Sequence, residues 1–227
     1  MTVVRQEAIL RREIIEAGRR LYQKNMVASN DGNISCRLSE GEFLVTPTGV
    51  CKGDMTEDML LKVDGEGNVL EGHRKATSEV KMHLAVYQER PDVKAVVHAH
   101  PRKATAFALA HIGFDEITMP EAVLALGSIA LTEYGTPSTE EIPLAIRKAI
   151  KTANALLLMN HGALTVGQSP MDAYFNMESL EHFAAISLYA RLLGGAHPLS
   201  EAQARELFRV RSEVYGKTSP FLDQSAE

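Results

Sequence analysis

Residues 93–101, VKAVVHAHP, form the stretch on which the fold and a candidate site both depend. Apolar residues alternate along it as they do in a β-strand. Side chains two positions apart on a strand point to the same face, so His98 and His100 place two imidazoles within reach of one metal ion. Pro101 ends the strand and exposes this end of it. A catalytic zinc site usually has three protein ligands and one open position, so a third ligand must come from elsewhere.

His161 is the best candidate for that third ligand, because it follows the buried strand in ALLLMNHG, residues 155–162. An isolated His-x-His pair is more often a packed or surface pair than a metal site. The third residue is therefore needed for the hypothesis. His182 stands four residues after Glu178, so a helical ligand pair is the alternative. The remaining histidines are otherwise expected to be structural or solvated: His73, His83, His111, His182 and His197.

Segments with helical periodicity flank these strands. Leu10, Ile14, Ala17 and Leu21 share one face of an amphipathic helix. Further helices are expected from Ser78, after Pro101, from the capping pair Ser138 and Glu141, from Ser169–Pro170 to Gly194–Gly195, and from the capping pair Ser200 and Gln203.

Hairpin patterns set the expected type of sheet. A loop at Ser39–Glu42 leads into a strand at Phe43–Thr46, and residues 60–72 form a second hairpin with a glycine-rich turn. Hairpins join antiparallel strands, whereas a doubly wound sheet is parallel. We therefore predict an α/β fold with three layers, α/β/α, and a largely antiparallel central sheet.

Composition narrows the class of protein. The chain has 227 residues, 45% of them hydrophobic, and a net charge of −5. That charge argues against nucleic-acid binding, and no apolar run is long enough for a membrane span or a signal peptide. Two cysteines, Cys36 and Cys51, make no disulfide framework. We expect a single cytoplasmic domain over residues 1–227, with a loose tail after about residue 216.

Three turns offer donors for an anion. They lie at Gly32–Asn33, Thr48–Gly49 and Thr77–Ser78. Taken singly, the first two are ordinary turns, and Ser78 is an N-cap whose neighbour Glu79 complements the helix dipole. Taken together, their hydroxyl, amide and backbone N–H groups could cradle a phosphate.

The order of these motifs resembles the class II aldolase/adducin family, and most of all the L-fuculose-1-phosphate aldolases. The resemblance spans residues 8–195 and rests on five motifs: Gly32-Asn33-x-Ser35, Thr46-Pro47-Thr48-Gly49, Thr77-Ser78-Glu79, His98-x-His100-Pro101 and Asn160-His161-Gly162.

The resemblance implies a zinc-dependent aldolase that cleaves a ketose 1-phosphate into dihydroxyacetone phosphate and an aldehyde. His98, His100 and His161 would hold the metal, for which Mn²⁺ or Co²⁺ are alternatives. Glu79 would transfer the proton and occupy the free metal position before substrate arrives. Gly32, Asn33, Thr48, Gly49, Thr77 and Ser78 would bind the phosphate. Such enzymes are typically homotetramers with sites at subunit interfaces.

Two departures leave the aldehyde half of the substrate open. Thr77 replaces the usual first serine of its motif, which keeps the hydroxyl. The tyrosine that fuculose enzymes place near the aldehyde has no counterpart at Met119-Pro120-Glu121. The alternatives are 5-deoxyribulose or methylthioribulose 1-phosphate, epimerisation of ribulose 5-phosphate, decarboxylation or dehydration of a sugar phosphate, and a non-catalytic adducin-like interaction module.

Overall fold

The computed structural model describes residues 3–137 and 139–217, and its centre is an eight-stranded sheet. The strands lie in the order β4-β3-β2-β1-β5-β8-β7-β6. All neighbours pair antiparallel except β6 and β7. The predicted antiparallel sheet is confirmed. The strand bounds are β1 Asn33–Ser39, β2 Glu42–Val45, β3 Leu61–Val63, β4 Val69–Glu71, β5 Ala95–Ala99, β6 Ile129–Leu131, β7 Ala155–Leu158 and β8 Gly162–Gly167.

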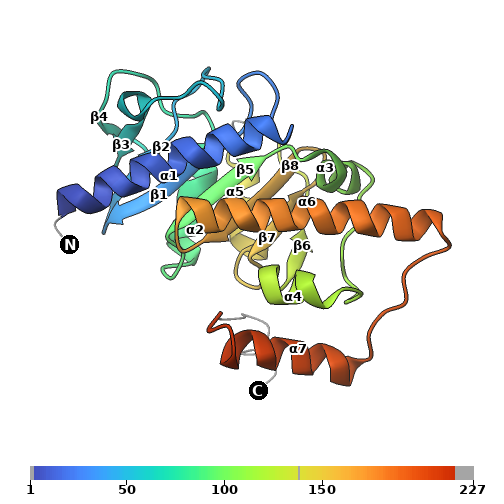
Figure 1. The fold of residues 1–227 in the computed structure, drawn as a ribbon. Coiled ribbons are helices and arrows are strands. Elements are labelled where there is room, and N and C mark those ends of the chain that lie inside the picture. Colours follow the sequence, from blue (N-terminus) through green and yellow to red (C-terminus); the bar gives the residue numbers. More distant parts are fainter. Residues whose placement is uncertain (1–2, 138, 218–227) are drawn as a thin grey trace.

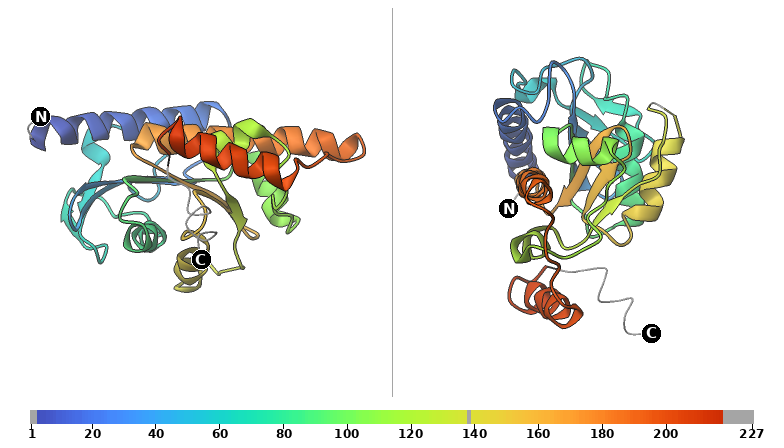
Figure 2. Two further views of the ribbon diagram at one scale, coloured as in Figure 1. Left: turned by 90° about the horizontal axis from the view of Figure 1, so that it is seen from below. Right: turned by 90° about the vertical axis from the view of Figure 1, so that its right-hand side faces the viewer.

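Helices cover both faces of the sheet, so the predicted three layers are present (Figure 1 and Figure 2, left). α1, α3 and α6 lie on one face, and α2 and α5 on the other. α4 packs between α6 and α7. The helix bounds are α1 Val3–Gln23, the 3₁₀ turn η1 Glu57–Met59, α2 Val80–Glu89, α3 Arg102–Leu109, α4 Pro120–Leu126, α5 Glu141–Ala149, α6 Pro170–Leu192 and α7 Glu201–Glu213.

Strand alternation divides the apolar residues into two cores. On β5, Val97 packs with Ile14 of α1, whereas Val96 packs on the opposite face with the residues of α2 and α5. Asn33 of β1 pairs with His98 of β5 across the ladder. Asn33, Ser35, Val96 and His98 therefore face the α2 side of the sheet. This register places the polar ends of two central strands beneath α2.

Local signals predicted most helix ends correctly. Ser169 caps α6 by accepting a hydrogen bond from the backbone of Asp172, and Ser200 forms a capping box with Gln203 at α7. Two helix starts were wrong. α2 begins at Val80 with Glu79 as its N-cap, so Ser78 is no cap. α5 begins at Glu141 with Glu140 as its N-cap, and Ser138 lies outside the described residues.

Other differences concern short elements. β1 continues through Ser39, so the first hairpin turn contains only Glu40 and Gly41. The short elements α4 and β6 lie in a region for which no elements were predicted, since neither is long enough to show a clear period. Within the described residues no helix is long and apolar enough to cross a membrane. The predicted loose tail falls mainly on residues 218–227, which lie outside the described part.

Candidate metal centre

Three histidines converge at one end of the central strands. His98 lies on β5, His100 follows that strand directly, and His161 lies in the turn between β7 and β8. One nitrogen of each lies within 4.8 Å of the others, and their ring centroids are 4.7 to 5.3 Å apart. Within residues 3–137 and 139–217 they form the one group of three or more side chains able to hold a metal ion.

The conformation of the turn that carries His161 depends on its two neighbours, Asn160 and Gly162. Asn160 has a φ of 57°, in the left-handed region that asparagine tolerates better than most residues. A Cβ on Gly162 would lie 2.5 Å from the His100 ring and 2.7 Å from the Ala99 carbonyl oxygen. The Asn160-His161-Gly162 motif is thus explained by backbone geometry and by the close approach of this turn to β5.

The protonation of His98 leaves one nitrogen available for a cation. Its Nδ1 donates to the carbonyl oxygen of Ala163 at 2.9 Å, so Nε2 carries a lone pair. That Nε2 is fully buried and has no hydrogen-bond partner among the described residues. Burial also lowers the pKa of His98, which favours the neutral ring. A neutral ring with its second nitrogen held by a backbone carbonyl is the usual state of a metal-binding histidine.

Glu79 completes the cluster from the start of α2. Its Oε1 lies 3.2 Å from His161 Nε2, and its Oε2 lies 3.5 Å from His98 Nε2. Burial raises the pKa of this carboxyl, but hydrogen bonds from His161 and Asn33 hold it below its ordinary value. A carboxylate and buried imidazole lone pairs therefore share a small volume, and a divalent cation fits this donor set.

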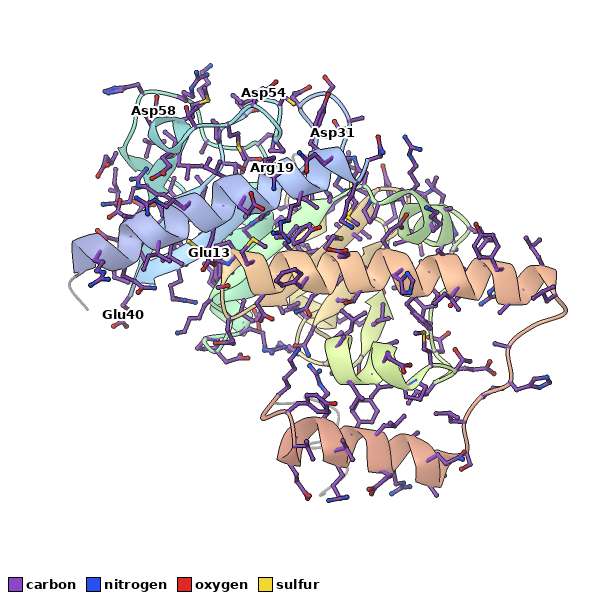
Figure 3. The ribbon with its side chains drawn as sticks, in the orientation of Figure 1. Glu13, Arg19, Asp31, Glu40, Asp54 and Asp58 are labelled. Carbon is purple, nitrogen blue, oxygen red and sulfur yellow. The ribbon has the colours of Figure 1, made fainter. Side chains whose placement is uncertain are left out.

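The exposure of the cluster differs from one histidine to the next. The His98 side chain is fully buried, whereas the side chain of His100 is 29% exposed. His100 is held outside the ladder because its backbone N–H donates to Met26. Asp31, in the loop after α1 (Figure 3), brings a carboxylate oxygen to 3.4 Å from His100 Nδ1. The centre is thus closed toward β5 and open toward this loop.

The three candidate anion-binding turns lie beside this cluster and contact one another. Thr77 donates its backbone N–H to Thr46, and Thr48 donates to Lys75. Thr46 in turn accepts from the backbone N–H of Ile34 through its hydroxyl at 3.2 Å. Segments 33–34, 46–48 and 75–77, which are far apart in the sequence, are therefore joined at this end of the sheet.

The individual side chains of these turns differ in how they are placed. Thr48, Gly49 and Ser78 are exposed, whereas Thr77 is buried and its hydroxyl accepts from the backbone N–H of Glu79. Gly32 has a φ of +74°, and a Cβ there would lie 3.0 Å from the carbonyl oxygen of His98. This glycine is required by the close approach of its loop to β5, whether or not an anion binds.

Sequence reasoning missed two partners of the cluster. Asp31 beside His100 lies in a turn with no distinctive spacing. His83, assigned to the structural or solvated histidines, is fully buried and bonds Asn33. His83 lies four residues after Glu79 on an expected helix, and this spacing could have indicated that the two side chains share one face. The alternative ligand pair lies elsewhere on α6, where Glu178 forms an ion pair with Lys24.

The fold and the arrangement of this site define a class II aldolase-type domain. The chain belongs to this family: the family model described as "Class II Aldolase and Adducin N-terminal domain" matches residues 12–188. The family and fold expected from the motifs are thereby confirmed, and the chain is an enzyme of the class II aldolase family.

Curated relatives carry two different names. A 3-oxo-tetronate 4-phosphate decarboxylase of Escherichia coli is 33% identical over 211 residues, which cover 91% of this chain and 97% of the relative. An L-fuculose phosphate aldolase of Methanococcus maripaludis is 34% identical over 176 residues, which cover 77% of this chain and 94% of the relative.

Solved structures of similar proteins have the same fold. A structure titled L-fuculose 1-phosphate aldolase superposes with a TM-score of 0.83 at 28% identity, covering 92% of this chain and 96% of the other. An L-fuculose-1-phosphate aldolase from Thermus thermophilus has a TM-score of 0.72 at 33% identity, covering 85% of this chain and all of the other.

Proposed function

We propose that the protein is a metal-dependent lyase that cleaves a ketose 1-phosphate of the L-fuculose 1-phosphate type into dihydroxyacetone phosphate and an aldehyde. The observation that carries this proposal is the convergence of three histidines and Glu79 beside three donor-rich turns. An adducin-like interaction module would have no need of such a donor set.

His98, His100 and His161 would hold a divalent ion, with Glu79 as a further ligand before substrate arrives. Zinc suits three imidazoles with an open position, and Mn²⁺ or Co²⁺ are alternatives. When bound, the ion would supply Lewis-acid stabilisation of negative charge on the substrate oxygens.

Glu79 is proposed as the group that handles the proton on carbon. When the C3–C4 bond breaks, the C4 hydroxyl loses its proton and becomes an aldehyde, and the electron pair remains on C3 as an enediolate. Protonation of C3 then yields dihydroxyacetone phosphate. The Glu79 carboxyl, which lies beside His98 and His161, would be the group that gives this proton.

A second candidate is decarboxylation of a 3-oxo-tetronate 4-phosphate, favoured by the relative that matches 91% of this chain. Loss of CO₂ from such an acid leaves the same enediolate as retro-aldol cleavage, and protonation again gives dihydroxyacetone phosphate. The same metal, phosphate turns and Glu79 would serve both reactions. The two candidates differ only in the half that departs, an aldehyde or CO₂.

Further candidates differ in the half of the substrate that departs. No tyrosine lies at residues 119–121, where the fuculose pattern would place one. 5-Deoxyribulose and methylthioribulose 1-phosphates, and epimerisation of ribulose 5-phosphate, therefore stay alternatives to fuculose 1-phosphate.

A substrate panel tests the proposal. The metal-loaded enzyme is incubated separately with each ketose 1-phosphate, with ribulose 5-phosphate and with a 3-oxo-tetronate 4-phosphate. Dihydroxyacetone phosphate, aldehyde, CO₂ and the epimer are measured in parallel. Aldehyde with dihydroxyacetone phosphate supports the aldolase, and CO₂ supports the decarboxylase. Absence of turnover on the whole panel would overturn both.

We expect turnover to require the phosphate group. Charge-assisted hydrogen bonds from the turns would position the reacting carbon, so removing the phosphate should raise KM and also lower kcat. Ser78→Ala should weaken the binding of phosphorylated substrates and leave the amount of bound metal unchanged. This variant is cleaner than Asn33→Ala, because the Asn33 amide also bonds Glu79. Equal efficiency on an unphosphorylated ketose would show that these are ordinary turns.

We also expect a homotetramer with sites at subunit interfaces, in the cytoplasm. Light scattering of the active enzyme at assay concentration checks the assembly. Full activity at a monomer mass would contradict both the tetramer and an intersubunit site.

A further inference from the structure

A buried chain of hydrogen bonds runs from Glu79 into the space between α2 and β1. Glu79, His83 and Tyr87 are spaced four residues apart, so they share the face of α2 that covers the sheet. Asn33 and Ser35 are two apart on β1 and face the same helix. Side chains from the helix and the strand thus alternate along one line.

Four contacts connect these five residues without a gap. Asn33 Nδ2 donates to Glu79 Oε2 at 2.7 Å. Asn33 Oδ1 lies 2.5 Å from His83 Nε2, and His83 Nδ1 lies 2.7 Å from Ser35 Oγ. Ser35 Oγ lies 2.7 Å from the Tyr87 hydroxyl.

The chemistry of the groups fixes the direction of each bond. Glu79 accepts as a carboxylate, so the amide of Asn33 must present its N–H to it and its oxygen to His83. His83 Nε2 then carries the proton and Nδ1 the lone pair. Ser35 spends its single hydroxyl proton on Nδ1, and Tyr87 donates to Ser35. A flipped Asn33 would instead aim its oxygen at the Glu79 carboxylate.

Burial holds this arrangement in one protonation state. Asn33, Ser35, His83 and Tyr87 are each no more than 3% exposed. Burial lowers the pKa of His83 to about 4, so the ring is neutral, and burial raises the pKa of Tyr87, so its hydroxyl stays a donor. The Tyr87 ring stacks on Phe43 with centroids 4.6 Å apart, which holds the far end of the chain.

We propose that His83 is a positioning residue for Glu79: its Nε2–H fixes the amide orientation of Asn33, and Ser35 and Tyr87 fix the tautomer of His83. The inference rests on the proposed role of Glu79. The residues that it adds, His83, Ser35 and Tyr87, are neither proposed metal ligands nor proposed substrate-binding residues. Without His83, only the Glu79 carboxylate orients the Asn33 amide, and the buried Asn33 oxygen is left without a donor.

The tautomer of His83 is the first test, and it does not depend on activity. ¹⁵N-detected NMR of the imidazoles in the metal-free full chain, with His83→Gln used to assign the signal, should show neutral His83 protonated on Nε2 at pH 7. Ser35→Ala should weaken this preference, since Nδ1 loses its donor. An Nδ1–H tautomer or an imidazolium in the unsubstituted protein would overturn the inference.

A matched pair of substitutions is the second test. Glutamine can place an N–H donor where His83 Nε2 lies, whereas asparagine reaches only as far as Nδ1. His83→Asn should lower kcat about tenfold or more with metal content little changed, and His83→Gln should restore most of the lost kcat. His197→Asn, an exposed site, is the control. Unchanged kcat in His83→Asn would overturn the inference, as would equal loss in both His83 variants.

The two proposals fail in different ways. If Glu79→Gln keeps turnover, the proposed function of Glu79 is wrong whatever the His83 tautomer. If Glu79→Gln loses turnover and His83 carries its proton on Nδ1, only the positioning role is wrong.

Discussion

Alanine at His98, His100 or His161 is expected to remove most of the bound metal and most of the activity. Each residue supplies one of three nitrogens that lie within 4.8 Å of one another, and no further histidine among the described residues joins the group. Loss of a residue that merely supports a metal ligand typically lowers metal affinity 10–100-fold, so loss of a ligand should cost more than about 100-fold.

Metal analysis of the purified variants checks this expectation, alongside turnover on the best substrate of the panel. His182→Ala is the matched control, because His182 is an exposed histidine on α6 and belonged to the alternative ligand pair. We expect this control to keep its metal. Full metal occupancy in His161→Ala would exclude His161 as a ligand, and metal loss in His182→Ala would revive the helical pair.

Glu79→Gln is expected to lower turnover by about 10²–10⁴-fold, the usual range for a positioned acid or base. Glutamine preserves the size of the side chain, so the fold and the binding of phosphorylated ligand should persist. The loss would arise because an amide cannot exchange a proton with carbon as a carboxyl can. Single-turnover kinetics and inhibition by a phosphorylated substrate analogue separate the two effects.

Glu178→Gln is the control for this variant, because Glu178 is another partly buried glutamate in an ion pair, in its case with Lys24. It should leave kcat near that of the unsubstituted enzyme. Near-normal kcat in Glu79→Gln would refute the proton-transfer role and direct attention to Asp31, the other carboxylate beside the histidines.

Local sequence signals predicted those features that depend on neighbours in the chain. The amphipathic period of α1, the serine caps of α6 and α7 and the hairpins were predicted because each depends on residues within one or two turns. The start of α2 was missed for one local and one tertiary reason. The Thr77 hydroxyl accepts from the backbone N–H of Glu79, and the Glu79 side chain is drawn toward histidines of two other elements.

For the site, the sequence by itself determined the two-residue spacing that keeps His98 and His100 together at the end of β5. β5 stops at Ala99, so a backbone hydrogen bond to Met26, and not the ladder, holds His100. The sequence also determined the motif order on which the family assignment rests. Only the tertiary structure decided that the β7–β8 turn brings His161 to this pair and that Glu79 lies between them. The same holds for Asn33 and Glu79, whose contact spans 46 positions of the chain. It depends on the register of β1 against β5 and on the packing of α2 over that face, and no local pattern encodes either.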